Sequence, residues 1–281
     1  MKVTSLHIHP LKSGAIIDLQ SAHLNGFGLA GDRTMMVVDD DGVFLTQRAL
    51  PKLAMVSIIG DKLSFPGQTE IEVQWSDPVF TASIWKSSAQ VQAADPAASA
   101  ALTAYLGHSV RLVRIAEDPQ RYASANWAPP NTPMALQDGY PILVACTASL
   151  DDLNAKIAAG PSGPGAQVPM NRFRPNIVIE TDEPWIEDSW RRVRVGEVVL
   201  DFLKPCQRCV LTTRDQTTGV ATNNEPSRTL MKWRRSVHPD QKGLMFAWNA
   251  VLVSGVRLVV GDEVEVLKSD PSGWPIQAVP K

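Results

Sequence analysis

The feature that most constrains the fold is a succession of short strand-forming stretches, each ended after a few residues by turn-forming residues. These stretches are rich in Val, Ile, Thr and Trp, or alternate apolar with polar residues, which is typical of strands. In the first half of the chain they occupy residues 2–9, 34–38, 43–46, 54–59, 71–75 and 79–85. The segment Asp39-Asp40-Asp41-Gly42 between two of them predicts a hairpin turn. Many short strands separated by turns favour a barrel or sandwich, so we predict a β-barrel-like N-terminal part.

The rest of the chain mixes strands with helices. Further strand-forming stretches lie at residues 110–115, 176–180, 193–195, 198–202, 210–213, 251–254 and 264–267. A first helix is predicted by Asp95 as N-cap, Pro96 at the first helical position and Gly107 at the end. Thr147 predicts the cap of a second helix, and a third is expected near residues 226–235. The predicted class is therefore α+β and β-rich.

Bulk properties exclude several classes of function. The chain has 281 residues, which is enough for one large or two moderate domains. A net charge of −2 and scattered basic residues indicate that it binds no nucleic acid. No apolar run approaches the roughly 20 residues that cross a bilayer, and the N-terminal residues lack the apolar core of a signal peptide. Three cysteines make no disulfide framework, so we expect a cytoplasmic protein. Without a spanning apolar run we also expect no membrane partner.

The sharpest local motif is a pair of cysteines, Cys206 and Cys209. It lies in the segment Lys204-Pro205-Cys206-Gln207-Arg208-Cys209-Val210-Leu211-Thr212-Thr213. A structural zinc site needs four ligands, but the only other cysteine is Cys146. A redox-active dithiol prefers a helix N-terminus, whereas Val-Leu-Thr-Thr after Cys209 favours a strand. The pair could also be two half-buried thiols without a chemical role, or one thiolate could bind a soft metal beside the charge of Arg208. The spacing alone leaves these interpretations open.

Four segments, in order, give the chain a resemblance to a known family. They are His9-Pro10-Leu11-Lys12-Ser13-Gly14, Gly31-Asp32-Arg33, Asn171-Arg172-Phe173-Arg174-Pro175-Asn176-Ile177-Val178-Ile179 and the cysteine segment. Over nearly its whole length the chain resembles the MOSC family, specifically its two-part proteins, which include the mitochondrial amidoxime-reducing component and its bacterial relatives. The resemblance implies a MOSC N-terminal β-barrel domain at residues 1–120. That domain would pack on a MOSC domain at residues 121–281, itself built around a β-barrel.

The same resemblance implies a molybdenum–molybdopterin cofactor and the residues that hold it. Cys209 matches the thiolate ligand of molybdenum, a soft and redox-active metal that thiolates suit. Cys206 is expected to be structural, and Asp138 matches an acidic residue near the metal that could relay protons. The other matching positions contact the phosphate or the pterin, and they are Lys12, Ser13, Arg33, Arg174, Asn176, Gln207, Arg208 and Asn249.

The function implied by the resemblance is reduction of N-hydroxylated small molecules, such as hydroxylamines, amidoximes or N-hydroxylated nucleobases. The sequence has no Gly-rich nucleotide motif and no cysteine after Cys209, so electrons would come from an external donor protein, a flavin or iron–sulfur reductase. The alternative is a carrier that holds or delivers the molybdenum cofactor or a metal–sulfur species without turnover. A third reading is a scaffold that has lost the cofactor. Two departures from the family pattern bear on this choice, because Gln207 stands where relatives often have serine and Ala247 where they often have glycine.

Overall fold

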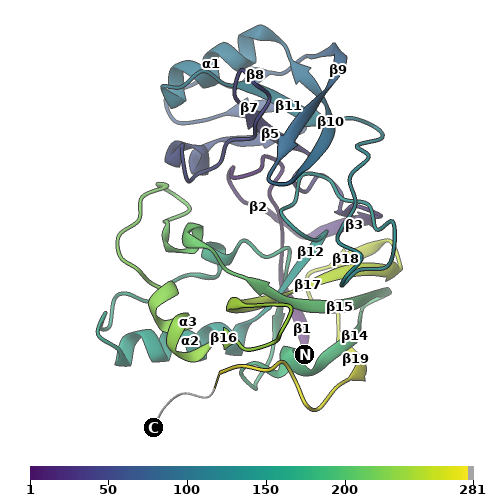
Figure 1. The fold of residues 1–281 in the computed structure, drawn as a ribbon, viewed down its shortest axis with the longest axis vertical. Helices are drawn as coiled ribbons and strands as arrows, with labels where there is room; N and C mark the ends of the chain where they lie inside the picture. Colours follow the sequence, from purple (N-terminus) through teal and green to yellow (C-terminus); the bar gives the residue numbers. More distant parts are fainter. Residues whose placement is uncertain (278–281) are drawn as a thin grey trace.

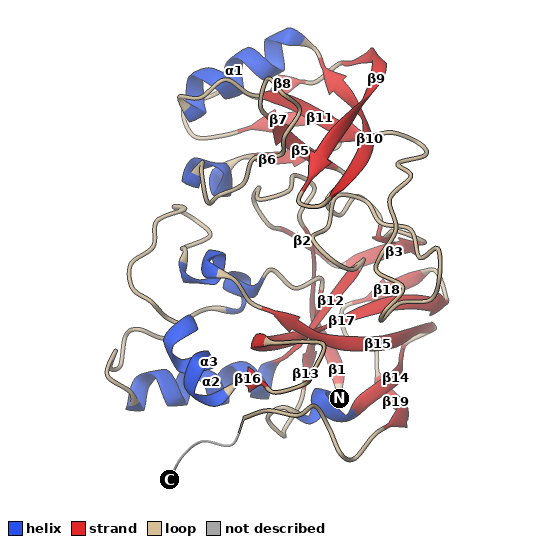
Figure 2. Ribbon diagram, viewed as in Figure 1, coloured by secondary structure: helices blue, strands red, loops and turns tan. Residues whose placement is uncertain are grey.

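The structure, a computed structural model, describes residues 1–277 apart from the side chains of residues 76–78. It has two lobes joined at a narrower waist (Figure 1). Strands dominate both lobes, and the helices lie toward the outside (Figure 2). No helix in the described part of the chain is long and apolar enough to span a membrane.

The smaller lobe, at the top of Figure 1, contains two sheets and one α-helix. Its elements are β5 (Met35–Val38), the 3-10 helix η1 (Pro51–Met55), β6 (Ser57–Ile59), β7 (Lys62–Ser64), β8 (Ile71–Glu72), β9 (Trp75–Ile84), β10 (Ser87–Ala94), α1 (Pro96–Leu106) and β11 (Arg111–Ile115). The antiparallel sheets run in the orders β5-β11-β10-β9 and β6-β7-β8. The apolar face of α1 packs on these strands, and the core that they share includes Leu53, Leu63, Leu102 and Leu112.

The larger lobe is built on one sheet of nine strands. Its elements are β1 (Lys2–Ile8), β2 (Ile17–Leu19), β12 (Ile142–Cys146), α2 (Thr147–Ala159), η2 (Met170–Phe173), β13 (Ile177–Glu180), η3 (Ile186–Ser189), β14 (Trp190–Val195), β15 (Val198–Gln207), η4 (Val210–Thr213), α3 (Ser227–Trp233), β16 (Arg235–Ser236), β17 (Gly243–Ser254) and β19 (Val264–Ser269). The strand order is β19-β14-β15-β17-β12-β13-β1-β2, and β16 pairs with β17. Trp190, Leu200 and Trp248 are fully buried in its core.

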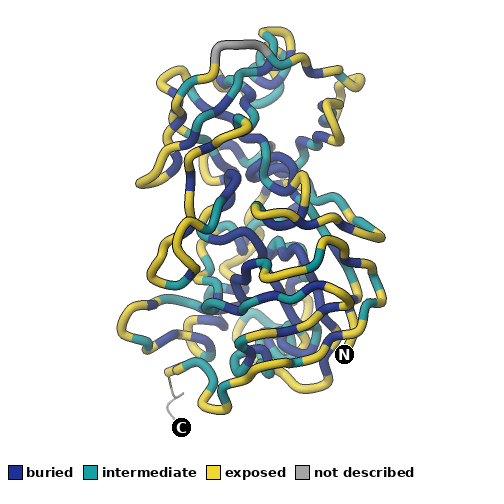
Figure 3. The backbone as a smooth tube through the Cα atoms, turned by 90° about the vertical axis from the view of Figure 1, so that its right-hand side faces the viewer, coloured by how far each residue is buried: buried dark blue, intermediate teal, exposed yellow. Residues whose placement is uncertain are grey.

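The first strands of the chain belong to this larger lobe. β1 lies between β13 and β2, and the small sheet β18-β3-β4 joins β3 (Ser21–Asn25) and β4 (Gly28–Leu29) to β18 (Arg257–Val259). Buried residues therefore continue from one lobe to the other through the waist (Figure 3). The α+β, β-rich class is confirmed, and each sheet is an open order of strands within residues 1–277. A domain boundary at residue 120 stays a prediction.

The predicted first helix is confirmed in detail. The Asp95 side chain accepts hydrogen bonds from the N–H groups of Ala97 and Ala98, at 2.9 and 3.1 Å. Pro96 is the first helical residue, where its missing N–H is not needed. Gly107 ends the helix with a left-handed φ of 71°.

Four local expectations are wrong. The stretch at residues 43–46 makes only isolated bridges and forms no strand. Residues 210–213 form the 3-10 helix η4 and not a strand. Thr147 is the first residue of α2 and does not cap it, because its hydroxyl accepts a hydrogen bond from the Thr181 N–H (3.2 Å) instead. The expected strand at residues 54–59 begins only at Ser57, because the Pro at position 51 starts η1 and the chain is helical to Met55.

Candidate functional site

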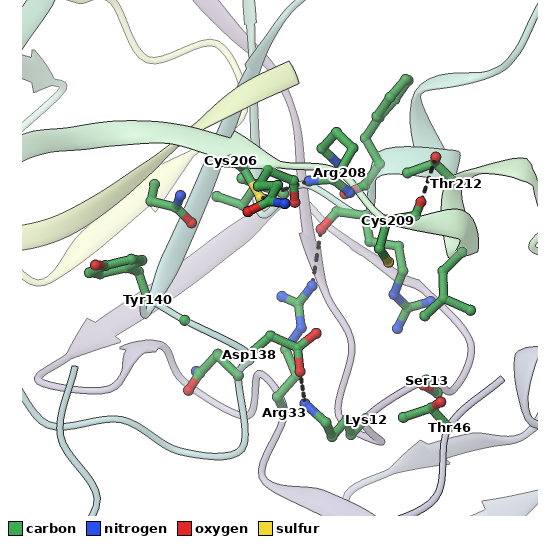
Figure 4. A pocket seen from close by; sticks show the side chains of 18 of the residues that line it. Lys12, Ser13, Arg33, Thr46, Asp138, Tyr140, Cys206, Arg208, Cys209 and Thr212 are labelled. Atoms are coloured by element: carbon green, nitrogen blue, oxygen red, sulfur yellow. Dashed lines mark hydrogen bonds and ion pairs between the residues drawn. The ribbon is translucent and has the colours of Figure 1, made fainter. Parts of the chain in front are cut away.

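A pocket opens between the two lobes, and both lobes contribute side chains to it (Figure 4). In the close-up, Cys209 and Thr212 approach from one side, while Lys12, Ser13 and Thr46 approach from the other. The structure brings every residue that the sequence predicted for the site to the wall of this pocket. These residues are Lys12, Ser13, Arg33, Asp138, Arg174, Asn176, Gln207, Arg208, Cys209 and Asn249. Their individual roles stay predictions.

The C-terminal end of β15 places the cysteine pair at the pocket. The strand pairs with β17 as far as Gln207, and the chain then turns at Cys209 into η4. The Thr212 hydroxyl stabilises this turn by donating to the Cys209 carbonyl (3.0 Å). The Cys209 side chain is exposed and lines the pocket, whereas Cys206 is half-buried. The Cys206 sulfur accepts a hydrogen bond from Nη1 of Arg208 (3.0 Å), so the first thiol is engaged and the second is free to bind.

Three arginines give this wall of the pocket a positive charge. Arg172 donates from Nη1 to the Thr213 carbonyl, and Arg208 donates from Nη2 to the Phe173 carbonyl, each at 2.8 Å. Arg174 donates from Nη1 to backbone and amide oxygens, but its buried Nη2 has no hydrogen-bond partner among the described residues. Burial, and then the charge of Arg33, lower the pKa of the Arg174 guanidinium to about 9. Arg174 therefore stays charged at neutral pH. Of the three arginines only Arg172 forms an ion pair among the described residues, with Asp215 (3.5 Å).

Lys12 and Asp138 form an ion pair that crosses the pocket floor. Nζ of Lys12 donates to Oδ1 of Asp138 (2.5 Å) and to the Leu136 carbonyl (2.8 Å). The Lys12 side chain is only 6% exposed, while that of Asp138 is 67% exposed toward the recess. Partial removal from water within the recess would by itself raise the pKa of the Asp138 carboxyl, but the charge of Lys12 and hydrogen bonds from Lys12 and Trp85 outweigh this effect and hold the pKa well below its usual range. Asp138 is therefore a fixed anion that accepts hydrogen bonds.

Arg33 is held by a buried network at the junction of the lobes. Its Nη1 donates to Oδ2 of Asp32 (2.6 Å) and to Oδ1 of Asn176 (3.3 Å). Burial would raise the pKa of Asp32, but the Arg33 charge and the hydrogen bonds of its neighbours lower it to about 2. Asn176 also accepts from the Leu143 N–H (3.0 Å) and donates to the His7 carbonyl (3.2 Å). Its side chain thus ties β1 to the start of β12 while it orients Arg33.

The backbone around the pocket is unusually often left-handed. Positive φ values occur at Ser13 (65°), Arg33 (48°), Trp85 (54°) and Arg174 (54°), all of which line the pocket. Such values cost a non-glycine residue on the order of 1–2 kcal/mol each. Conformations of this cost cluster at functional sites, where the surrounding structure enforces them. Ala247 also has a positive φ (65°), which explains why glycine suits that position.

A polar wall closes the other end of the pocket. Asn249, opposite Lys204 in the β15–β17 ladder, donates from its side-chain nitrogen to the Lys204 carbonyl (3.3 Å). Oε1 of Gln207 accepts from Nε2 of Gln241 (3.3 Å), and Gln241 also accepts from Nζ of Lys204. The Lys204 ammonium lies 5.4 Å from the centre of the Tyr140 ring, which also lines the pocket. Gln207 is therefore held in place by a network of neighbours.

The sequence did not single out several residues of the pocket wall. Trp85, Thr46, Tyr140 and Arg172 line the pocket as well, three of them from segments outside the four recognised motifs. Arg172 lay within a recognised motif, so its place was open to prediction. Trp85 carried a weaker signal, since it stands at the end of a predicted strand, where an exposed hairpin tip is expected.

The donor set decides what kind of metal centre this pocket can hold. Among residues 1–277, no group of three or more His, Cys, Asp or Glu side chains is placed to hold a metal ion. A metal here would take most of its ligands from a bound molecule, with the Cys209 thiolate as the available soft donor. Arg174 and Arg208, which form no ion pair within the described part of the chain, suit an anionic group such as a phosphate.

Comparison with known proteins agrees with this arrangement. Residues 1–109 match the family model of the MOSC N-terminal beta barrel domain, and residues 131–265 match that of the MOSC domain. The chain is 32% identical to mitochondrial amidoxime-reducing component 1 of Danio rerio over 256 residues, which cover 85% of this chain and 76% of that protein. It is 29% identical to component 1 of Homo sapiens over 286 residues, covering 94% and 82% of the two chains. Component 2 of Bos taurus is 29% identical over 258 residues, covering 86% and 74%. The chain therefore belongs to the MOSC family, in the group whose members carry a MOSC N-terminal beta barrel domain before the MOSC domain.

Proposed function

We propose that this protein is a molybdenum cofactor-dependent oxidoreductase that reduces N-hydroxylated small molecules with electrons from a partner reductase. The observation that carries the proposal is the exposed Cys209 thiol in the same pocket as Arg174 and Arg208, each of which has a buried N–H group without a partner among the described residues. Family membership supports it, because the relatives named above are amidoxime-reducing components.

The residues of the pocket fit an anionic, dithiolene-bearing cofactor. The unpaired Nη2 of Arg174 and Nε of Arg208 are buried donors without partners among the described residues, as a site for a negatively charged ligand requires. Arginine pairs with phosphate through two parallel hydrogen bonds, which gives the contact direction as well as charge. Ser13 and Thr46 add hydroxyl groups from the side of the pocket that faces Cys209. When bound, the molybdenum–molybdopterin group would supply a two-electron redox centre that can accept an oxygen atom.

The residues of the pocket would then have separate roles in binding the cofactor and the substrate. Cys209 would hold the metal, and Arg174 and Arg208 would bind the cofactor's phosphate. Lys12 would fix Asp138, whose remaining carboxylate oxygen would accept a hydrogen bond from a substrate N–H or O–H group. The low pKa of Asp138 makes it a weak base, so the proton relay suggested by the sequence is the less suitable role.

The partner and the compartment are also proposals. An external flavin or iron–sulfur reductase would supply the electrons, since the residues proposed to bind the molybdenum cofactor would bind no second redox group. We place the protein in the reducing cytoplasm, because the site depends on a free thiol and its three cysteines are unpaired. The relatives that are named mitochondrial make the mitochondrion the competing location.

Metal analysis and turnover together test the proposal. The full chain is purified from a host that makes molybdopterin, as wild type, Cys209→Ser and the matched control Cys206→Ser. We expect about one molybdenum per chain in the wild type and the control, and little in Cys209→Ser. With chemically reduced viologen as donor, the wild type should reduce an amidoxime to the amidine. Wild type without molybdenum would refute the proposal. Bound molybdenum without turnover would favour the carrier function, and metal lost only from Cys206→Ser would show that the other thiol is the ligand.

A further inference from the structure

The tip of the β9–β10 hairpin reaches from the smaller lobe into the pocket. Antiparallel pairing of Ile84 with Ser87 leaves Trp85 and Lys86 as a two-residue turn. Trp85 is half exposed and lines the pocket, although it comes from a hairpin that otherwise packs within the smaller lobe. Its φ of 54° is one that glycine or asparagine adopts at low cost and that a bulky residue adopts only under constraint. A large aromatic residue in this conformation indicates that the side chain is needed where it stands.

The Trp85 side chain is fixed by three neighbours. Its indole Nε1–H donates to Oδ1 of Asp138 (2.8 Å). The Arg48 guanidinium lies over the indole ring, 4.7 Å from its centre, and Phe44 makes an edge contact with a centroid distance of 4.7 Å. The stacked arginine and the edge-on ring hold the indole plane, so the N–H bond has a defined direction.

Asp138 receives both of its hydrogen bonds on one oxygen. Lys12 and Trp85 each donate to Oδ1, and no hydrogen bond from the described residues reaches Oδ2. The other charged groups around the carboxylate are Arg33, Arg121 and Arg174. A carboxylate held by one oxygen from two directions cannot rotate freely, so its second oxygen keeps one orientation in the exposed recess.

We propose that Trp85 is a positioning residue that aims Oδ2 of Asp138 at the substrate and so favours compounds with an N–H group on the carbon atom that bears the N–OH group. The inference rests on the proposed function for the identity of the substrate. An amidoxime carries such an NH₂ group, whereas an aldoxime has a hydrogen atom in its place. A fixed carboxylate oxygen that faces the amino position binds the first there, whereas the second has no donor at that position. The hairpin of the smaller lobe thereby takes part in substrate selection.

The chain offers a matched control for this residue. Trp75, at the start of β9, donates its indole N–H to Oδ1 of Asp61 (2.7 Å), and Arg114 lies over its ring at 4.7 Å. Trp75→Phe therefore removes the same kind of hydrogen bond under the same kind of stacked arginine, but it does so outside this pocket. Trp85→Phe keeps an aromatic ring but removes the N–H donor together with the five-membered ring of the indole, and Trp75→Phe makes the same loss.

Kinetics with a matched pair of ligands form the first arm of the test. Benzamidoxime is used as substrate, and benzaldoxime, which lacks the amino group, is used as a competing ligand of the same loaded enzyme. Trp85→Phe should raise KM for benzamidoxime roughly tenfold with little change in kcat, as expected for a weakened hydrogen bond to a charged group. The inhibition constant of benzaldoxime should stay within about twofold. Trp75→Phe should leave both constants at the wild-type value. Equal effects of the two variants, or equal effects on the two ligands, would overturn the proposal.

A second arm does not depend on turnover. In protein without cofactor, Asp138→Asn should shift the indole N–H resonance of Trp85 relative to wild type, because the charged acceptor is lost, while the Trp75 indole resonance stays unchanged. An indole resonance that ignores Asp138 would overturn the positioning role whatever the activity. If the wild type reduced no N-hydroxylated compound while the resonance followed Asp138, the proposed function would fail and the Trp85–Asp138 contact would stand.

Discussion

Glu187 is a buried carboxyl whose ionisation should make stability fall as the pH rises. It lies in η3, is 2% exposed and accepts a hydrogen bond from the Ser149 hydroxyl (2.8 Å). Burial, and then the charge of the adjacent Asp188, raise its pKa from the ordinary 4.5 to about 7, against the opposing effects of Ser149 and Arg234. We therefore predict that Glu187→Gln removes a pH-dependent loss of stability.

The size and sign of this effect follow from the two pKa values. A carboxyl with a higher pKa in the folded protein stabilises it below pH 4.5, and that stabilisation is lost as the pH rises to about 7. At 1.36 kcal/mol for each pH unit, ionising Glu187 costs the folded protein about 3 kcal/mol more than the unfolded chain. For a chain of this length that corresponds to a melting temperature lower by about 5 °C.

Urea unfolding at pH 5 and pH 8 measures this difference. Any fixed effect of the new amide is the same at both pH values, so the tested quantity is the change between them. Relative to wild type, Glu187→Gln should gain about 3 kcal/mol in its free energy of unfolding on going from pH 5 to pH 8. Glu180→Gln, which changes a glutamate on the surface, serves as control. Parallel pH profiles for Glu187→Gln and wild type would refute the reasoning.

Two further variants test the junction of the lobes and the cationic wall. Gly219 has a φ of 74°, and a Cβ there would come 2.1 Å from the Pro51 carbonyl oxygen, so Gly219→Ala should lower the free energy of unfolding by about 3 kcal/mol. Gly163→Ala, with a similar φ of 72° and open space, should cost only about 1 kcal/mol, and equal losses in urea unfolding would contradict the argument. Arg174→Met should abolish the thermal stabilisation of cofactor-free protein by inorganic phosphate, which Arg192→Met, a change at an exposed ion pair, should leave intact. Undiminished stabilisation of Arg174→Met would show that the anion binds elsewhere.

The sequence located most of the candidate site because its chemistry is concentrated in short, ordered motifs. Cys209 and Arg208 share one segment, and Arg174 and Asn176 share another, so a few local patterns carry several side chains of the pocket. Their convergence depends on β1 entering the sheet beside β13, which brings the N-terminal motif next to the third one. Alternation in residues 2–9 predicted the strand but could not reveal its partner, because pairing partners are set by tertiary packing.

Trp85 shows what local patterns leave out. Its neighbours in sequence identify a strand end, but the contact with Asp138 joins residues 53 positions apart. Asp32 is the converse case, since a local turn residue proved to be a buried partner for both Arg33 and the N–H group of His9. In both cases an indole or a carboxylate binds a group from another segment of the chain. Residue type alone does not predict which segment supplies that partner.

The error at residues 210–213 has the most direct bearing on the site. Val-Leu-Thr-Thr has strand-forming composition, yet the hydroxyls of Thr212 and Thr213 donate to the carbonyls of Cys209 and Val210, each three residues earlier, and this favours a 3-10 turn. Nη1 of Arg172 donates to the Thr213 carbonyl at the end of the turn (2.8 Å). Had the chain continued as a strand, Cys209 would have remained in the ladder with β17, where alternate side chains face the core. The turn takes Cys209 out of that ladder, so the same two threonines that suggested a strand leave its thiol exposed in the pocket.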